Sequence, residues 1–274
     1  MKLGYALTVP DAAAPGTGDS PARPFDALRV AADYGFDGVD LSIRDPSVLD
    51  LDALERAVTT LGLTVSAIAT GQACTRDGLC LTAPDPSVRE SAVARLLAQT
   101  DAAHRFGALL AIGVIHGRVP DGESRRSAEE RLLPALRRVA RAARGRGVRL
   151  VVEPIRRHST NWLHTAREVL DLIARLGEDN VGVLLDTFHM SLEEADPAAA
   201  VRDAAPRLWH FHVAEENRRA PGWGHLDFAA CVLSLRTAGY DGFVSAEVAP
   251  DPTLDAAARQ TIAVMRPLVP RGAP

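Results

Sequence analysis

The chain alternates between short, continuous apolar runs and longer segments in which apolar residues recur at helical spacing. Continuous apolar runs, as opposed to alternating ones, are typical of parallel strands that helices cover. Eight such runs are predicted to be strands, at residues 3–8, 38–42, 63–70, 108–115, 148–153, 181–186, 208–213 and 243–248.

Three of the segments between these runs have the clearest helical pattern, with apolar residues three and four positions apart. They predict helices over 87–106, 128–144 and 165–177. Gly177 is placed to end the last of them, because glycine readily adopts the left-handed conformation at a helix C-terminus. Pro134 lies inside the second pattern, so we expect that helix either to start late or to kink there.

Eight strand–helix units fit two α/β folds, a closed (β/α)8 TIM barrel and an open doubly wound sheet. We expect a single TIM-barrel domain over residues 1–274, because eight units fill the length and no GxGxxG motif follows the first strand. Residues 9–24, rich in Ala, Pro and Gly, are expected to form a long loop after that strand, either a lid or a plain insertion. Residues 269–274 are expected to be a frayed tail.

The amino-acid composition argues against several classes of protein. Of the 31 basic residues only Lys2 is a lysine, which excludes Schiff-base aldolases, pyridoxal-phosphate enzymes and P-loop NTPases. The net charge of −4 argues against a nucleic-acid partner, and no apolar run approaches the ~20 residues that cross a membrane. Cys74, Cys80 and Cys231 form no CxxC pair and no signal peptide is evident, so we expect free thiols in a cytoplasmic protein.

The last four predicted strands each carry a potential metal ligand near their end. Glu153 ends the fifth and Asp186 the sixth, while His212 lies in the seventh and Glu247 in the eighth. Because the C-terminal ends of TIM-barrel strands converge on one mouth, we expect these side chains to meet. Carboxylates gathered there would repel one another unless protons or a cation lay among them. This oxygen-rich set suits Mn²⁺, Mg²⁺ or Co²⁺; the alternative is ordinary pairing with arginines.

Other polar residues are expected near the same mouth. His210 precedes His212 by two residues and so faces the same side of the strand; we expect the ligand to be His212, which is nearer the strand end. His189 lies in the loop after Asp186. Arg218, in the loop after the seventh strand, could fix a substrate hydroxyl or phosphate with its planar guanidinium.

Several segments resemble one known enzyme family. Over residues 25–250 the chain is similar to the D-tagatose/D-allulose (psicose) 3-epimerase group of xylose-isomerase-like TIM barrels, often labelled sugar phosphate isomerase/epimerase. The segments that carry the resemblance are LTAPDPSVRE, VVEPIRR, VGVLLDTFHM, LWHFHVAEENRRAPGWGHLDF and GYDGFVSAEV.

The resemblance implies one divalent metal, Mn²⁺ first and Co²⁺ or Mg²⁺ as alternatives, held by Glu153, Asp186, His212 and Glu247. It also implies that Glu153 and Glu247 act as the acid/base pair on opposite faces of a keto sugar. Proton transfer would run through a metal-stabilised enediolate. Members of this family are commonly dimers or tetramers, so we expect a homo-oligomer.

The substrate pocket is where the chain departs from the family. The family's substrate-binding His and Arg fall on His189 and Arg218. After EPxxR the family usually has a glutamate that contacts substrate, and this chain has His158. Where the family commonly has Asn-Thr, this chain has His164 and Thr165. The resemblance therefore implies an intact metal and proton-transfer site beside an altered substrate pocket.

These observations predict a divalent-metal-dependent epimerase or isomerase of a keto sugar or related polyol ketone. The nearest alternative is a lyase of the same superfamily, a keto-inositol dehydratase or a 3-keto-glycoside eliminase, in which His158 and His164 would serve as extra acids. A phosphodiesterase with several zinc ions fits the negative charge and the oxygen-rich set poorly. A metal-bearing binding protein without turnover is the remaining alternative.

Overall fold

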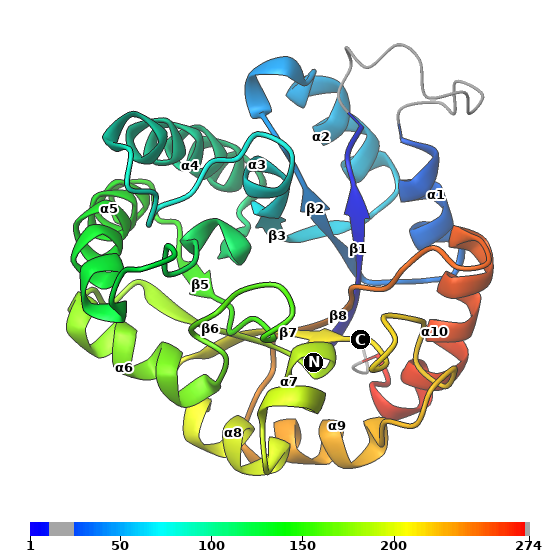
Figure 1. Ribbon diagram of the computed structural model, residues 1–274. Coiled ribbons are helices and arrows are strands. Elements are labelled where there is room, and N and C mark those ends of the chain that lie inside the picture. The colour runs from blue at the N-terminus through cyan, green and yellow to red at the C-terminus, as the bar shows by residue number, and fades with distance from the viewer. Residues whose placement is uncertain (11–24, 272–274) are drawn as a thin grey trace.

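The computed structural model describes residues 1–10 and 25–271, which form a closed barrel of parallel strands inside a ring of helices (Figure 1). The strands pair in chain order and the last pairs with the first. This arrangement confirms the predicted (β/α)8 TIM barrel. The strands are β1 (Lys2–Thr8), β2 (Gly38–Ser42), β3 (Thr64–Ala69), β4 (Leu109–Ile112), β5 (Leu150–Val152), β6 (Val181–Asp186), β7 (Leu208–Val213) and β8 (Phe243–Ala246).

The helices follow one another around the strands, and α7 lies inside the ring (Figure 1). Within the described ranges, no helix combines the length and the apolar character needed to cross a bilayer. The helices are α1 (Asp26–Asp33), η1 (Pro46–Val48), α2 (Leu51–Thr60), α3 (Gly71–Thr75), α4 (Pro86–Phe106), η2 (Val114–His116), α5 (Arg125–Gly145), α6 (Ala166–Leu176), α7 (Thr187–Glu193), α8 (Pro197–Ala204), α9 (Phe228–Thr237) and α10 (Leu254–Leu268), where η denotes a 3-10 helix.

The three helices with the clearest sequence pattern are α4, α5 and α6. Thr165 caps α6 through a capping box with Glu168, and Gly177 ends that helix in the left-handed conformation at φ 71°. Ser124 caps α5, whose first residue is Arg125. The helix therefore starts well before Pro134, which excludes the late start; Pro134 lies within it.

Two of the predicted boundaries differ from the structure. The apolar run at 108–115 leaves the strand after Ile112, because Gly113 turns the chain into η2. Of the tail expected to fray over residues 269–274, only residues 269–271 belong to the described part of the chain, and two of them keep contacts with the rest of the barrel. Val269 is buried, and Arg271 donates to the carbonyl of Gly35 at 2.6 Å. Of the loop predicted at residues 9–24, only residues 9 and 10 belong to the described part of the chain.

Apolar side chains fill the layer between strands and helices, where α5 contributes the fully buried Leu132, Leu136 and Val139. The inside of the barrel, by contrast, holds a polar cluster. Asp40 of β2 contacts His212 of β7, although these two strands are not neighbours in the sheet. The contact therefore crosses the barrel interior, directly beneath the mouth.

Candidate metal centre

Four side chains from consecutive strands meet at the mouth of the barrel. Glu153 directly follows β5, and Asp186 ends the neighbouring strand β6. His212 lies opposite Asp186 in the register of β7, and Glu247 directly follows β8. One potential ligand atom from each of the four lies within 4.8 Å of the others. The structure thus brings together the four residues that the sequence pattern singles out.

Arg218 supplies positive charge to one side of this cluster. Its guanidinium donates to Oδ2 of Asp186 and to Oε2 of Glu247. Its backbone has a left-handed φ of 65°, and its carbonyl accepts from the amide of Ala249 at 2.7 Å, which ties its loop to the segment after β8. Pairing with an arginine therefore applies to two of the three carboxylates. A single guanidinium cannot neutralise all three, and Glu153 is the carboxylate left over.

The two glutamates have opposite electrostatic surroundings. Burial raises the pKa of Glu153 to about 8, and the charges of Glu247 and Asp186 act in the same direction. Burial alone would also raise the pKa of Glu247. There the charge of Arg218 and the hydrogen bond to His212 outweigh burial and hold the pKa well below its usual range. The metal-free mouth therefore keeps a proton on Glu153 at neutral pH.

A divalent cation fits this donor set. Glu153 is only 8% exposed, and its Oε1 has no hydrogen-bond partner within the described parts of the chain. That oxygen lies 3.9 Å from Nδ1 of His212. Buried hydrogen-bond acceptors normally have a partner. A cation bound among the ligand atoms of the cluster would provide one for this carboxylate oxygen. Three carboxylates and one imidazole form the oxygen-rich set that Mn²⁺, Mg²⁺ and Co²⁺ accept.

His189 of α7 lies at the edge of the cluster. Its Nδ1 accepts from the amide of Arg156 at 3.2 Å, so the ring proton is on Nε2, which lies 3.7 Å from Oε1 of Glu153. Burial lowers the pKa of His189 to about 4, so its imidazole is neutral at pH 7. Phe188 contacts two guanidiniums, with Arg156 at 4.3 Å and Arg218 at 4.4 Å from its ring centroid. The sequence did not single out Arg156 or Phe188.

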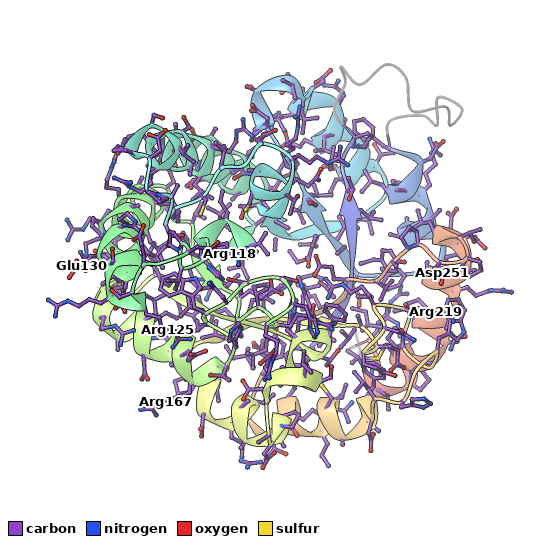
Figure 2. All side chains as sticks on the ribbon, in the orientation of Figure 1. Arg118, Arg125, Glu130, Arg167, Arg219 and Asp251 are labelled. Atoms are coloured by element: carbon purple, nitrogen blue, oxygen red, sulfur yellow. The ribbon has the colours of Figure 1, made fainter. Side chains whose placement is uncertain are left out.

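His158 lies outside this cluster. It is exposed in the loop after β5, where its Nδ1 is 3.4 Å from the Arg156 guanidinium. The loop after β7 is anchored near α10, where Arg219 pairs with Asp251 at 3.0 Å (Figure 2). This ion pair joins the loop that carries Arg218 to the segment that precedes α10.

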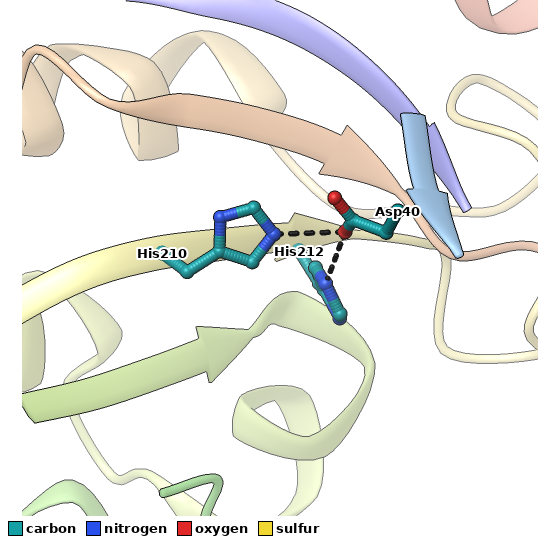
Figure 3. A group of neighbouring side chains, drawn as sticks. All are labelled: Asp40, His210 and His212. Atoms are coloured by element: carbon teal, nitrogen blue, oxygen red, sulfur yellow. Dashed lines mark hydrogen bonds and ion pairs between the residues drawn. The ribbon is translucent and has the colours of Figure 1, made fainter. Parts of the chain in front are cut away.

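Sequence reasoning missed Asp40, which lies directly beneath the four-residue cluster. Its carboxylate accepts hydrogen bonds from both His210 and His212 (Figure 3). The signal was present, because Asp40 is an acidic residue inside an apolar run, much as Asp186 is an acidic residue at the end of one. It lies in the second strand, whereas the recognised candidates lie in the last four.

The fold and this cluster define a known class of protein. The family model described as "Xylose isomerase-like TIM barrel" matches residues 28–268. The chain therefore belongs to the xylose isomerase-like TIM barrel family.

Among individual proteins, the chain is 35% identical over 217 residues to an L-ribulose 3-epimerase of Mesorhizobium japonicum, covering 78% of this chain and 71% of the relative. It is 32% identical over 233 residues to a ketose 3-epimerase of Arthrobacter globiformis, covering 82% and 79%. A solved structure of an L-ribulose 3-epimerase matches with a TM-score of 0.83 and 28% identity, over 98% of this chain and 94% of that one. These relatives agree with the resemblance noted in the sequence.

Proposed function

We propose that the protein is a divalent-metal-dependent epimerase of a keto sugar, with ketose 3-epimerisation as its reaction. The observation that carries the proposal is the four-residue cluster, in which the buried Oε1 of Glu153 has no hydrogen-bond partner among the described residues. The names of the relatives, L-ribulose 3-epimerase and ketose 3-epimerase, supply the reaction class.

The two glutamates are proposed to act on opposite faces of the substrate. Glu153 follows β5 and Glu247 follows β8, so they reach the cluster from different sides of the mouth. One glutamate takes the proton from the carbon beside the carbonyl, and the electron pair moves into an enediolate. The other returns a proton to the opposite face of the same carbon, which inverts it. A bound divalent cation supplies Lewis-acid stabilisation of the negative charge that develops on the substrate oxygens.

Three further residues are proposed to contact the sugar. His189 offers its Nε2 proton next to Glu153, and Arg218 offers a planar guanidinium that already spans two carboxylates. His158 is proposed as a contact at the outer edge of the mouth, where its exposed ring can meet the far end of an open-chain sugar. Hydrogen-bond donors of this kind suit the many hydroxyl groups of a keto sugar.

The finer properties are also proposals. Mn²⁺ is the proposed metal, with Co²⁺ or Mg²⁺ as alternatives, because oxygen-rich donor sets suit these ions. A dimer or tetramer is proposed from the resemblance, and sedimentation velocity tests it. The cytoplasm is the proposed location, which fits three cysteines that are all free.

The test uses the intact protein stripped of metal with a chelator and then reloaded with Mn²⁺, Co²⁺ or Mg²⁺. L-ribulose and D-psicose are incubated with each form in D₂O, and products are analysed by NMR and mass spectrometry. We expect activity only in the reloaded forms, with one deuterium at C3 and no loss of water. A product lighter by one water would favour the lyase instead. Absence of exchange on every keto sugar tested would overturn the proposal.

A matched pair of variants separates catalysis from general effects of losing a charge. Glu247→Gln keeps the size of the side chain but removes its acid/base function, and we expect exchange to stop. Glu130→Gln makes the same change on the outer surface of α5, where Glu130 is 63% exposed and pairs with Arg126 (Figure 2). That variant is expected to keep full activity.

A further inference from the structure

A buried carboxylate lies under the candidate metal centre and joins two histidines to it. Asp40 of β2 points across the barrel interior at His210 and His212 of β7 (Figure 3). Its Oδ2 accepts from Nε2 of His210 and from Nε2 of His212, each at 2.8 Å. Both distances are those of strong, charge-assisted hydrogen bonds.

The second oxygen of Asp40 is also occupied. Its Oδ1 accepts from the hydroxyl of Ser66 and, at 3.2 Å, from the hydroxyl of Ser245. Asp40 is 1% exposed, and both serines are buried. A buried carboxylate is stable only when its oxygens are hydrogen-bonded, and here four donors from β3, β7 and β8 meet that need. The position of the Asp40 carboxylate is therefore fixed from three sides.

This arrangement decides which nitrogen of His212 keeps its proton when a cation binds. An ionised carboxylate only accepts hydrogen bonds, so Nε2 of His212 must be the protonated nitrogen. Nδ1 is then the nitrogen that points at the four-residue cluster. Without a cation it donates to Oε2 of Glu247 at 3.2 Å, and a cation bound there would take the place of that proton. Nδ1 is also the side of the ring that approaches Glu153, at 3.9 Å.

We propose that Asp40 is a positioning residue that keeps Nε2 of His212 protonated and directs Nδ1 at the position of the divalent cation. His210 serves as a brace, because its hydrogen bond to the same oxygen restrains the Asp40 carboxylate. The inference rests on the proposed metal-dependent function and identifies how the chain prepares the single nitrogen donor of the four-residue cluster. Loss of a residue that hydrogen-bonds to a metal ligand typically weakens metal binding by about 10–100-fold.

A competing arrangement uses the same atoms. Asp40, His210 and His212 also have ligand atoms close enough to hold an ion of their own. Hydrogen bonding explains them better, because both nitrogens contact one oxygen at 2.8 Å and two serine hydroxyls occupy the other. A second ion would also require both Nε2 atoms to be deprotonated. Metal stoichiometry distinguishes the two arrangements.

The test measures Co²⁺ binding to the full-length, chelator-stripped protein by its visible absorption and by competition with a chromophoric chelator. Asp40→Asn keeps the size of the side chain and removes its charge. We expect about 10–100-fold weaker Co²⁺ binding with an altered absorption spectrum. His210→Gln keeps a donor toward Asp40 and is expected to lose less affinity than Asp40→Asn. Wild-type affinity and spectrum in Asp40→Asn would overturn the proposal, as would two ions per wild-type chain.

Asp37→Asn is the matched control for damage to the fold. Asp37 lies immediately before the N-terminal end of β2. Its carboxylate accepts from the amide of Leu3 at 2.8 Å and from the guanidinium of Arg266 at 2.9 Å. Its loss is expected to lower thermal stability and to leave Co²⁺ affinity unchanged. If Asp37→Asn weakened Co²⁺ binding as much as Asp40→Asn does, the effect of Asp40 would be structural only and the proposal would fail.

A measurement on the wild-type protein keeps the test decisive if Asp40→Asn does not fold. Nitrogen-15 NMR of the histidines in the Zn²⁺-loaded protein is expected to show His212 with a protonated Nε2 and a metal-bound Nδ1. Binding through Nε2 would overturn the proposal. If the wild-type chain bound no metal, the proposed function would fail with it, whereas unchanged binding in Asp40→Asn would overturn this inference alone.

Discussion

Removing the divalent cation is predicted to make the stability of the protein fall as the pH rises from about 6.5 to about 8. In the metal-free protein, burial first and then neighbouring charges raise the pKa of Glu153 to about 8. An unfolded glutamate has a pKa of about 4.3. Between these values the folded protein holds a proton that the unfolded chain has released. The stability that Glu153 contributes is therefore fully present below the pKa it has in the unfolded chain. It is lost as the pH rises through the pKa it has in the folded protein.

The size of the effect follows from proton linkage. Between about pH 6.5 and pH 8, Glu153 alone removes roughly 1.5 kcal/mol from the free energy of unfolding. That corresponds to a fall in Tm of roughly 3–6 °C for a domain of this size.

Two buried histidines also titrate. Burial lowers the pKa of His189 to about 4, so its contribution to stability rises with pH, mostly below about pH 6.5. Burial also lowers the pKa of His212, but Asp40 and Glu247 raise it well above the usual value, so its contribution falls with pH and opposes that of His189.

The assay is thermal unfolding followed by circular dichroism, in chelator and in Mn²⁺, at several pH values between about 6.5 and 8. A bound cation takes over the role of the proton, so the gain in Tm from Mn²⁺ is expected to be larger at the upper end of this range. Glu153→Gln removes one of the two groups whose titration lowers stability in this range, so the metal-free profile should become less steep. A metal-free Tm that stays constant or rises across this range would refute the reasoning, and so would a Glu153→Gln profile with the wild-type slope.

Three substitutions test other parts of the account. Arg218→Met removes the guanidinium that pairs with two carboxylates. The metal-free protein should then lose about 2 kcal/mol of unfolding free energy in urea titrations. An unchanged free energy would contradict the role of Arg218 as the counter-charge of Asp186 and Glu247. Thr165→Ala removes the capping box of α6 and should cost about 1 kcal/mol without changing metal affinity. Gly4→Ala should lower Tm and weaken Co²⁺ binding, because a Cβ at Gly4 would lie 2.2 Å from the Ser245 hydroxyl beneath the metal centre; a Tm equal to wild type would show that the strand accommodates it.

The fold could be predicted from the sequence because its signal is local. Each strand of a TIM barrel is buried on both faces, so it appears as an uninterrupted apolar run. The boundaries were less predictable where the apolar run continues beyond the strand. Val114 and Ile115 extend the run at 108–115, yet Gly113 turns them into η2, where Ile115 packs in the core. Hydrophobicity alone does not distinguish these two uses of an apolar residue.

The candidate site was partly predictable for the same reason. Glu153 and Asp186 stand out as charges at the ends of apolar strands, and the geometry of a barrel requires such ends to converge. The Asp40–His212 hydrogen bond spans 172 positions in the chain, and only the closed barrel brings its partners together. The contact of Arg156 with Phe188 depends on loop conformation, which no periodic pattern encodes.

The most direct test of the central claim is anomalous diffraction from crystals of the protein grown with Mn²⁺. One manganese peak per chain is expected, within bonding distance of Glu153, Asp186, Glu247 and Nδ1 of His212. A peak elsewhere in the barrel, or no peak at a Mn²⁺ concentration that restores activity, would contradict it.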